Sequence, residues 1–241
     1  MKQILLYIIS GMLSFLLSGC KKGAFGNEGE MVTTTRPSGS FGQIILSDNV
    51  NLVLTQDTIE NIRVEAPSKI EPYITTQISN HSLTIRNENA GKLIPPGETI
   101  NVYVSVKDLG RFDYLGSGNV SCTNTLNKDY FSFVVSDAAG DVHLKLKTIF
   151  TSVYLYSDMA DLVLEGQSDS CYTYCSSLGT IDYSNYNVKK LGLDYSSIRD
   201  AYVWASQSLN GRIFYKGNVY YRGNPVLTRA ETSNEGRFIH Y

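Results

Sequence analysis

Residues that could do acid–base or nucleophilic chemistry are few and scattered in this chain. The three histidines lie far apart: His81, His143 and His240. No serine stands in a nucleophile-elbow pattern, and the sequence has neither a glycine-rich phosphate loop nor a His-Glu-x-x-His motif. Three aspartates come nearest to the clustered carboxylates of a carbohydrate-active β-helix enzyme, but their spacing does not bring them together: Asp182, Asp194 and Asp200. We therefore predict that the protein is not an enzyme.

Short polar residues at turns could suggest a calcium site. They recur along the second half of the chain: Asn119, Asp137, Asp141, Asp158, Asp161 and Asn218. Calcium-binding solenoids have a glycine-rich nine-residue period, which is absent here. Asp and Asn are favoured at turns because their side chains hydrogen-bond local backbone groups. We predict no metal and no cofactor.

The cysteines could form a disulfide or remain free. Besides Cys20, which is assigned below, the chain contains Cys122, Cys171 and Cys175. On an extended strand Cys171 and Cys175 would lie about 13 Å apart, beyond the roughly 7 Å between Cα atoms that a disulfide tolerates. A disulfide between them would require the strand to bend after Tyr174. We predict free thiols, with Cys122 packed inward as a small hydrophobic residue.

Aromatic residues are the candidate binding groups, since the chain has 17 Tyr, 9 Phe and 1 Trp. Period-two alternation predicts an outward aromatic set that could contact a sugar ring or a partner protein: Tyr154, Tyr156, Tyr202, Trp204 and Tyr220. The same alternation assigns four tyrosines to the core: Tyr172, Tyr174, Tyr183 and Tyr221. The alternative for the outward set is cross-strand packing that stabilises a wall of the fold.

The N-terminus has the pattern of a secretory signal. Lys2 is followed by an apolar run from residue 4 to residue 17, which is shorter than the roughly 20 residues that span a bilayer. The run ends in Leu17-Ser18-Gly19-Cys20, which resembles the lipobox of bacterial lipoproteins. The resemblance implies a signal peptide over residues 1–19 and lipid attachment at Cys20. A plain secretory signal is the alternative.

Residues 20–40 are rich in Gly, Thr, Ser and Asn, and we predict that they form a flexible tether. Lys21 and Lys22 follow the cysteine, without the acidic cluster that marks surface export in some lipoproteins of this type. We therefore expect a lipid anchor in the outer membrane, with the periplasmic face preferred over the cell surface. A net charge of −2 gives no support for nucleic-acid binding.

From Phe41 onward, apolar residues alternate with polar ones, as in half-buried strands. The run from Ile100 to Val106 is one example. No window offers a helical stripe outside the signal. Together with 42% hydrophobic and 18% charged residues, this pattern predicts a folded, all-β protein.

A repeat of about 20 residues organises the second half of the chain. Its members are Gly118-Asn119-Val120, Gly140-Asp141-Val142, Ala160-Asp161-Leu162, Gly179-Thr180-Ile181, Arg199-Asp200-Ala201 and Gly217-Asn218-Val219. Each unit is predicted to contain two short strands joined by a serine-containing corner, followed by a wider turn. Units of this kind bury a core only by stacking, so we expect a β-solenoid. A β-sandwich is the alternative, but its strands would recur every 8–12 residues.

Several blocks match a known family in order and spacing. They are Phe41-Gly42-Gln43-Ile44, Val50 to Gln56, Val64-Glu65-Ala66, Leu83-Thr84-Ile85, Gly116 to Val120 and Gly217 to Pro225. On these residues the chain resembles the auto-transporter adhesin head GIN domain family, which is common in Bacteroidetes. The family's Ser-Gly corners are intact only at Gly116-Ser117-Gly118. The resemblance implies a right-handed, single-stranded β-helix-like fold over residues 41–241, with N-terminal strands over 41–110 and coils over 111–225.

These observations favour a non-enzymatic lipoprotein of the cell envelope that presents a binding surface, in the manner of an adhesin. Its partner would be a glycan or an envelope protein, besides the membrane reached through the anchor. The alternative is a structural or assembly component, in which stacking continues between molecules through an exposed edge strand. The sequence leaves the oligomeric state open.

Overall fold

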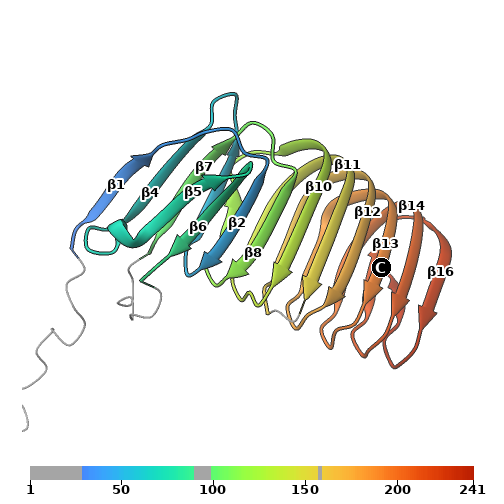
Figure 1. Cartoon of the computed structure of the whole chain (residues 1–241). Helices are drawn as coiled ribbons and strands as arrows, with labels where there is room; N and C mark the ends of the chain where they lie inside the picture. Colours follow the sequence, from blue (N-terminus) through green and yellow to red (C-terminus); the bar gives the residue numbers. More distant parts are fainter. Residues whose placement is uncertain (1–28, 90–98, 157–158) are drawn as a thin grey trace, which may run out of the picture.

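The computed structural model describes residues 29–89, 99–156 and 159–241. Within these ranges, seventeen strands form one continuous hydrogen-bonded sheet that winds into a solenoid (Figure 1). The one helical turn among the described residues is the 3-10 helix η1 (Glu71–Tyr73). The β-solenoid predicted from the repeat is therefore confirmed.

The strands of the N-terminal part are β1 (Met31–Arg36), β2 (Gln43–Asp48), β3 (Asn51–Gln56), β4 (Asn61–Pro67), β5 (Ile74–Ser79), β6 (Ser82–Asn87), β7 (Asn101–Val106), β8 (Arg111–Gly116) and β9 (Val120–Cys122). The later strands are β10 (Leu126–Ser136), β11 (Val142–Tyr156), β12 (Leu162–Ser176), β13 (Ile181–Tyr195), β14 (Ala201–Ile213), β15 (Val219–Arg222), β16 (Val226–Thr232) and β17 (Phe238–His240).

The solenoid has two walls. What we call the front wall runs in the order β5-β6-β2-β8-β10-β11-β12-β13-β14-β16 and uses the second halves of the long strands β10 to β14. The rear wall runs β1-β4-β7-β3-β9-β11-β12-β13-β14-β15-β17 and uses the first halves of β11 to β14. Each of the strands β11 to β14 therefore belongs to both walls.

Each long strand bends between its first and second halves, and this bend takes the place of the wider turn predicted from the sequence. β11, β12 and β13 are each 15 residues long, and the pairing of β11 with β12 continues through Lys147 and Thr148. Gly166 lies in the bend of β12 with a φ of +106°, a conformation that residues with a Cβ rarely adopt. A bend inside a hydrogen-bonded strand leaves no periodic turn signature, which is why the sequence suggested two short strands.

The N-terminal end is built differently from the repeat. β6 and β7 stack outside β2 and β3, so the order of coils along the axis differs from the order in the chain. β5 pairs antiparallel with β6, and β4 pairs antiparallel with both β7 and β1. The prediction of a tether up to residue 40 is wrong for Met31–Arg36, which form β1. This strand is polar because one of its faces is exposed, so it lacks an apolar signal.

Alternating residues of successive coils form inward columns that make the core. Nine residues of these columns are buried: Val142, Leu144, Leu162, Leu164, Ile181, Tyr183, Ala201, Val203 and Val219. Tyr221 is partly buried against this cluster. Cys122 is also partly buried there, as predicted.

The phase of β12 differs from the prediction. Tyr172 and Tyr174 point outward, whereas Cys171, Thr173 and Cys175 point into the core. Small residues fit there because the rings of Tyr183 and Tyr186 fill the neighbouring core, and the Tyr183 hydroxyl lies 3.3 Å from Thr173 Oγ1.

Asn and Asp side chains at the corners link one coil to the next. In five pairs, a side-chain oxygen of the first residue accepts a hydrogen bond from the backbone N–H of the second: Asn51 and Asn119, Asn119 and Asp141, Asp161 and Thr180, Asp200 and Asn218, and Asn218 and Arg237. In each pair the side-chain oxygen accepts the backbone N–H of the next coil at 2.7–3.1 Å. Among the turn residues predicted to bond the backbone, this role is confirmed for Asn119, Asp161 and Asn218, with the neighbouring coil as the donor; Asp158 lies outside the described residues.

Candidate functional site

The predicted outward aromatic residues lie on two different walls. Tyr154 and Tyr156 lie in the second half of β11, on the front wall, where Tyr154 pairs with Tyr174. Tyr202, Trp204 and Tyr220 lie on the rear wall, where Tyr202 pairs with Tyr220. Each of the five directly follows a buried residue of its strand and is itself partly or fully exposed, so all five point outward. They cannot act as one surface.

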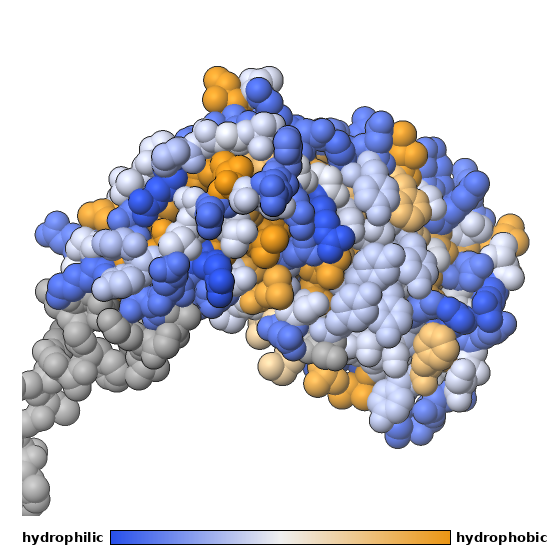
Figure 2. Space-filling view, viewed as in Figure 1, coloured by the Kyte–Doolittle hydropathy of each residue, from blue (hydrophilic) through white to orange (hydrophobic). Residues whose placement is uncertain are grey.

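The two front-wall tyrosines belong to a larger group of outward tyrosines, although the sequence prediction placed two of its members in the core. Tyr154, Tyr156, Tyr172 and Tyr174, which we call the tyrosine wall, form a connected set of ring contacts. The rings of Tyr154 and Tyr156 stack at 6.1 Å between centroids, and Tyr156 contacts Tyr174 at 5.4 Å. Tyr154 meets Tyr172 edge to face at 6.0 Å. Figure 2 shows side chains of intermediate hydropathy gathered over this part of the front wall.

A charged pair adjoins the tyrosine wall on the next two coils. The hydroxyl of Tyr172 donates to Asp194 Oδ2 at 2.9 Å, and Arg212 Nε donates to Asp194 Oδ1 at 2.6 Å. A second guanidinium nitrogen of Arg212 contacts Oδ2. The Arg212 hydrogen bonds hold the pKa of Asp194 below its usual value. Burial, together with the hydrogen bond to Asp194, raises the pKa of Tyr172 to about 12.

The three aspartates considered for catalysis are not brought together. Asp194 lies on the front wall, Asp182 pairs with Tyr202 on the rear wall, and Asp200 lies at a corner. Asp182 Oδ1 accepts the backbone N–H of Ser184 at 2.8 Å. Each carboxylate is thus engaged with groups of its own neighbourhood.

An exposed row of apolar side chains, the apolar ridge, borders the tyrosine wall. It consists of Met159, Leu178, Ile198 and Tyr215, which are 64%, 56%, 55% and 41% exposed. With nearby serines they line a hollow of about 600 Å³. Hydrophobic side chains lie along the lower edge of the front wall in Figure 2.

The exposure of two ridge residues, Leu178 and Ile198, has a local cause that the sequence prediction missed. Ser177 Oγ accepts the backbone N–H of Gly179, and Ser197 Oγ accepts that of Arg199. The serines thereby turn inward and are buried, and the residue after each serine projects into solvent. A large apolar residue directly after successive corner serines was the available signal.

The rear-wall aromatics pack mainly against one another. Tyr202 and Tyr220 stack at 5.1 Å with an interplanar angle of 14°. Tyr241 meets both rings edge to face. The guanidinium of Arg222 lies 4.1 Å from the ring centroid of Trp204, a cation–π contact. For this group the alternative of wall-stabilising packing describes the geometry better.

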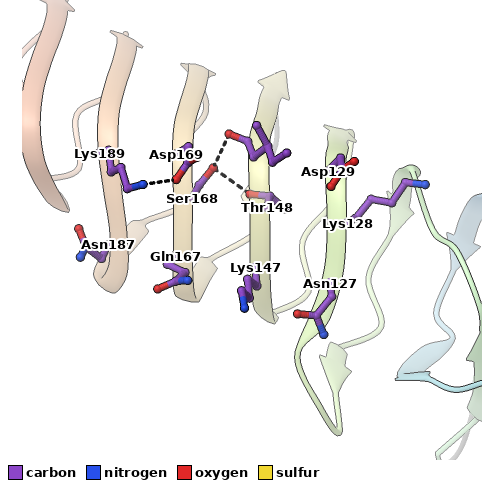
Figure 3. A pocket seen from close by; sticks show the side chains of 11 residues that line it. Asn127, Lys128, Asp129, Lys147, Thr148, Gln167, Ser168, Asp169, Asn187 and Lys189 are labelled. Carbon is purple, nitrogen blue, oxygen red and sulfur yellow. Dashed lines mark hydrogen bonds and ion pairs between the residues drawn. The ribbon is translucent and has the colours of Figure 1, made fainter.

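A polar hollow of about 630 Å³ lies at the bend of the long strands (Figure 3). Four of the residues that line it form a row across four adjacent coils: Asn127, Lys147, Gln167 and Asn187. Lys189 pairs with Asp169 at 2.7 Å within the hollow. Its floor is a buried hydroxyl network, in which Thr148 Oγ1 donates to Ser168 Oγ at 2.8 Å. Nothing in the sequence prediction pointed to this hollow.

Among the described residues, the cysteine thiols and the acidic side chains form no additional catalytic or metal-binding site. Cys122, Cys171 and Cys175 are not joined in a disulfide, as predicted. Burial raises the pKa of the Cys171 thiol to about 12, so this thiol is chemically inert in the fold. Within residues 29–89, 99–156 and 159–241, no group of three His, Cys, Asp or Glu residues could hold a metal ion.

These features define a β-solenoid protein whose front wall carries an exposed aromatic and apolar surface. A family model described as "Putative auto-transporter adhesin, head GIN domain" matches residues 40–225. The chain belongs to this family, as its sequence blocks predicted. The adhesin description is typical of a cell-envelope protein. No curated protein matches the sequence significantly, and the described part of the chain contains no helix that could cross a membrane.

Solved structures share the fold at low sequence identity. A putative adhesin from Bacteroides fragilis is 19% identical with a TM-score of 0.80, over 88% of this chain and 97% of that one. A putative adhesin from Parabacteroides distasonis is 16% identical with a TM-score of 0.63, over 90% and 97%. A protein from the same organism described as a putative lipid binding protein is 14% identical with a TM-score of 0.65, over 88% and 97%.

Proposed function

We propose that this protein is a non-enzymatic, adhesin-type binding module of the cell envelope, which contacts a partner protein through the tyrosine wall and the apolar ridge. One observation carries the proposal. Six large apolar or aromatic side chains along one edge of the front wall are each at least 41% exposed: Tyr156, Met159, Leu178, Ile198, Phe214 and Tyr215. Contiguous apolar surface of this kind marks interaction sites on soluble domains.

The composition of this surface favours a protein over a sugar. Protein interfaces are enriched in Tyr, Met and Arg, and Arg212 lies beside the tyrosine wall, held in place by Asp194. Branched aliphatic side chains such as Leu178 and Ile198 offer no hydrogen bond to a sugar hydroxyl. Tyr rings supply rigid contact area at low entropic cost.

A capture experiment on envelope extracts tests the proposal. Wild-type protein and the double variant Leu178→Ser/Ile198→Ser are used as baits, with Ile59→Ser as the matched control. Ile59 is 71% exposed and lies at the other end of the molecule. Proteins captured by wild type and by I59S but lost with the double variant support the ridge as the contact surface.

Equal capture by all three baits would overturn the proposal. A glycan array and lipid vesicles are tested in parallel. If a glycan or the vesicles bind wild type and I59S but not the double variant, that class of ligand replaces the partner protein in the proposal. Lipids are included because one structural neighbour, from Parabacteroides distasonis, is described as a putative lipid binding protein.

We further propose that the chain is a lipoprotein anchored through Cys20 in the outer membrane, facing the periplasm. The support is the sequence pattern Leu17-Ser18-Gly19-Cys20 after an apolar run; these residues lie outside the described part of the structure. Cys20→Ser is expected to abolish incorporation of labelled fatty acid and to release the protein from the membrane fraction. Unchanged labelling in C20S would refute the anchor.

Protease treatment of intact cells tests the membrane face. Protection of the chain until the outer membrane is permeabilised supports the periplasmic face. Cleavage on intact cells would instead place the solenoid on the surface, where an adhesin meets other cells.

A further inference from the structure

The two ends of the solenoid are finished in different ways. At the N-terminal end, antiparallel strands close both walls: β5 beside β6, and β1 with β4 beside β7. At the C-terminal end, β16 is the last strand of the front wall and pairs with β14 in the described part of the chain. All seven residues of β16 are exposed. A strand left in this way presents unpaired backbone groups to a further strand.

The outer face of the front wall carries a column of alternating charge that stops at this edge. Asp194, Arg212 and Glu231 follow one another in register on β13, β14 and β16. Arg212 binds Asp194, and Glu231 forms an ion pair with Arg229 of its own strand at 2.6 Å. The column therefore ends in an acid at the free edge, with an arginine two residues away.

This arrangement is self-complementary in one antiparallel register. If β16 pairs with a second β16 about a two-fold axis at Ala230, each Arg229 lies opposite the Glu231 of the other chain. The charge column then continues with an arginine after Glu231. Ala230, the residue at the axis, is small and exposed, so it offers no steric obstacle.

We infer that β16 is a homodimerisation edge, which pairs antiparallel with β16 of a second copy of this chain with Ala230 at the two-fold axis. Isologous contacts of this type use the same patch on both subunits. The charge complementarity favours a second copy over an unrelated strand, since β16 itself supplies both halves of the pattern. The contact is confined to one strand, so the association is weak and depends on protein concentration.

Cysteine cross-linking of the full chain in cells tests the register. In this register the two Ala230 Cα atoms lie about 4.5–5.5 Å apart, within the range for a disulfide, so Ala230→Cys should give a covalent dimer when an oxidant is added. Thr228→Cys is the matched control: its two copies would lie about 13 Å apart and should not cross-link. Wild type, treated in the same way, controls for the native thiols.

Charge exchange tests the pairing itself. Adding Arg229→Glu or Glu231→Arg to A230C places like charges opposite each other and should abolish the cross-link. Co-expression of the two double variants places glutamates on one chain opposite arginines on the other, and should restore it.

Three results would each overturn the inference: no dimer with A230C, equally strong dimers with T228C, or no rescue on co-expression. A cross-linked product with a mass other than twice that of the chain would assign the edge to a different partner.

Discussion

The ring of Phe238 occupies the space that a side chain on Gly211 would need. A Cβ atom at Gly211 would lie 2.6 Å from Cε1 of Phe238, well inside van der Waals contact. Gly211 belongs to β14 and Phe238 to β17, which lies beyond the residues matched by the family model. The ring packs against the hydrophobic core. Phe238 therefore covers the core at the C-terminal end of the described solenoid.

We expect Gly211→Ala to destabilise the protein by about 1–3 kcal/mol, because the added methyl group displaces the Phe238 ring. Urea denaturation measures the change in the free energy of unfolding. In the Phe238→Ala background the methyl group has room, so the same substitution should cost much less. Equal costs in the two backgrounds would show that the ring and Gly211 are not coupled.

Asp194→Asn should lower stability at neutral pH, because the charged acceptor for Tyr172 and Arg212 is lost. The hydrogen bond from Tyr172 alone accounts for about 0.5–1 kcal/mol, since solvent screens the partly exposed carboxylate. Asp169→Asn is the control: Asp169 and its partner Lys189 are both more than half exposed, so its loss should have almost no effect.

The effect of D194N should depend on pH in a defined direction. The pKa of Asp194 is lowered in the fold from its usual 3.8. The stabilisation is therefore complete well above pH 3.8 and disappears as the pH falls through the lowered pKa. Denaturation series at several pH values should show the difference between wild type and D194N shrinking in acid. A constant difference would contradict this assignment.

Tyr186→Phe should cost about 1 kcal/mol by removing a buried hydroxyl from its partners. The hydroxyl lies 2.7 Å from Thr151 Oγ1 and 3.2 Å from Thr148 Oγ1. Tyr130→Phe is the control, because Tyr130 is 51% exposed. Thermal or urea unfolding measures both variants, and a loss no greater for Y186F than for Y130F would argue against the network.

The same substitution should alter stability in alkali. Burial is the main cause that raises the pKa of Tyr186 from 10.0 to about 12. Stability from this group is complete below pH 10 and is lost as the pH rises towards 12, because the unfolded phenol ionises first. Stability should thus fall less steeply with rising pH in Y186F than in wild type. Equal slopes would contradict the raised pKa.

Alkylation should distinguish the thiols. Cys171 and Cys175 are buried, so an alkylating reagent should modify them only after unfolding. Cys122 is partly exposed and should react slowly in the native protein, because burial raises its pKa. Mass spectrometry counts the adducts, and a mass two hydrogens too low in the unreduced protein would reveal a disulfide.

The repeat was predictable because corner chemistry recurs at a fixed spacing. The stacking of β11 to β14 and the inward columns at Val142 and Leu162 follow directly from that spacing. The phase of β12 was not predictable from alternation, since tyrosines on one face and a Cys-Thr-Cys series on the other both suit a core. The choice was decided by volume: Tyr183 and Tyr186, from the next coil, fill the interior.

The candidate site was predictable in part. Alternation identified Tyr154 and Tyr156 as outward, but it could not show that Tyr202 lies on the opposite wall, because the strands bend without a turn residue at a constant position. The apolar ridge depends on corner hydrogen bonds such as that of Ser177 to Gly179, which alternation within strands does not describe.

The corner oxygens that accept N–H groups from the following coil have an evolutionary consequence. Because five junctions between neighbouring coils carry this bond, as Asp200 does to Asn218, a coil can be duplicated or deleted at such a junction while an equivalent partner remains. A partial coil would break that match. A chain with such junctions can therefore lengthen or shorten in steps of one repeat, and the distance between its two ends can change separately from the surface it displays.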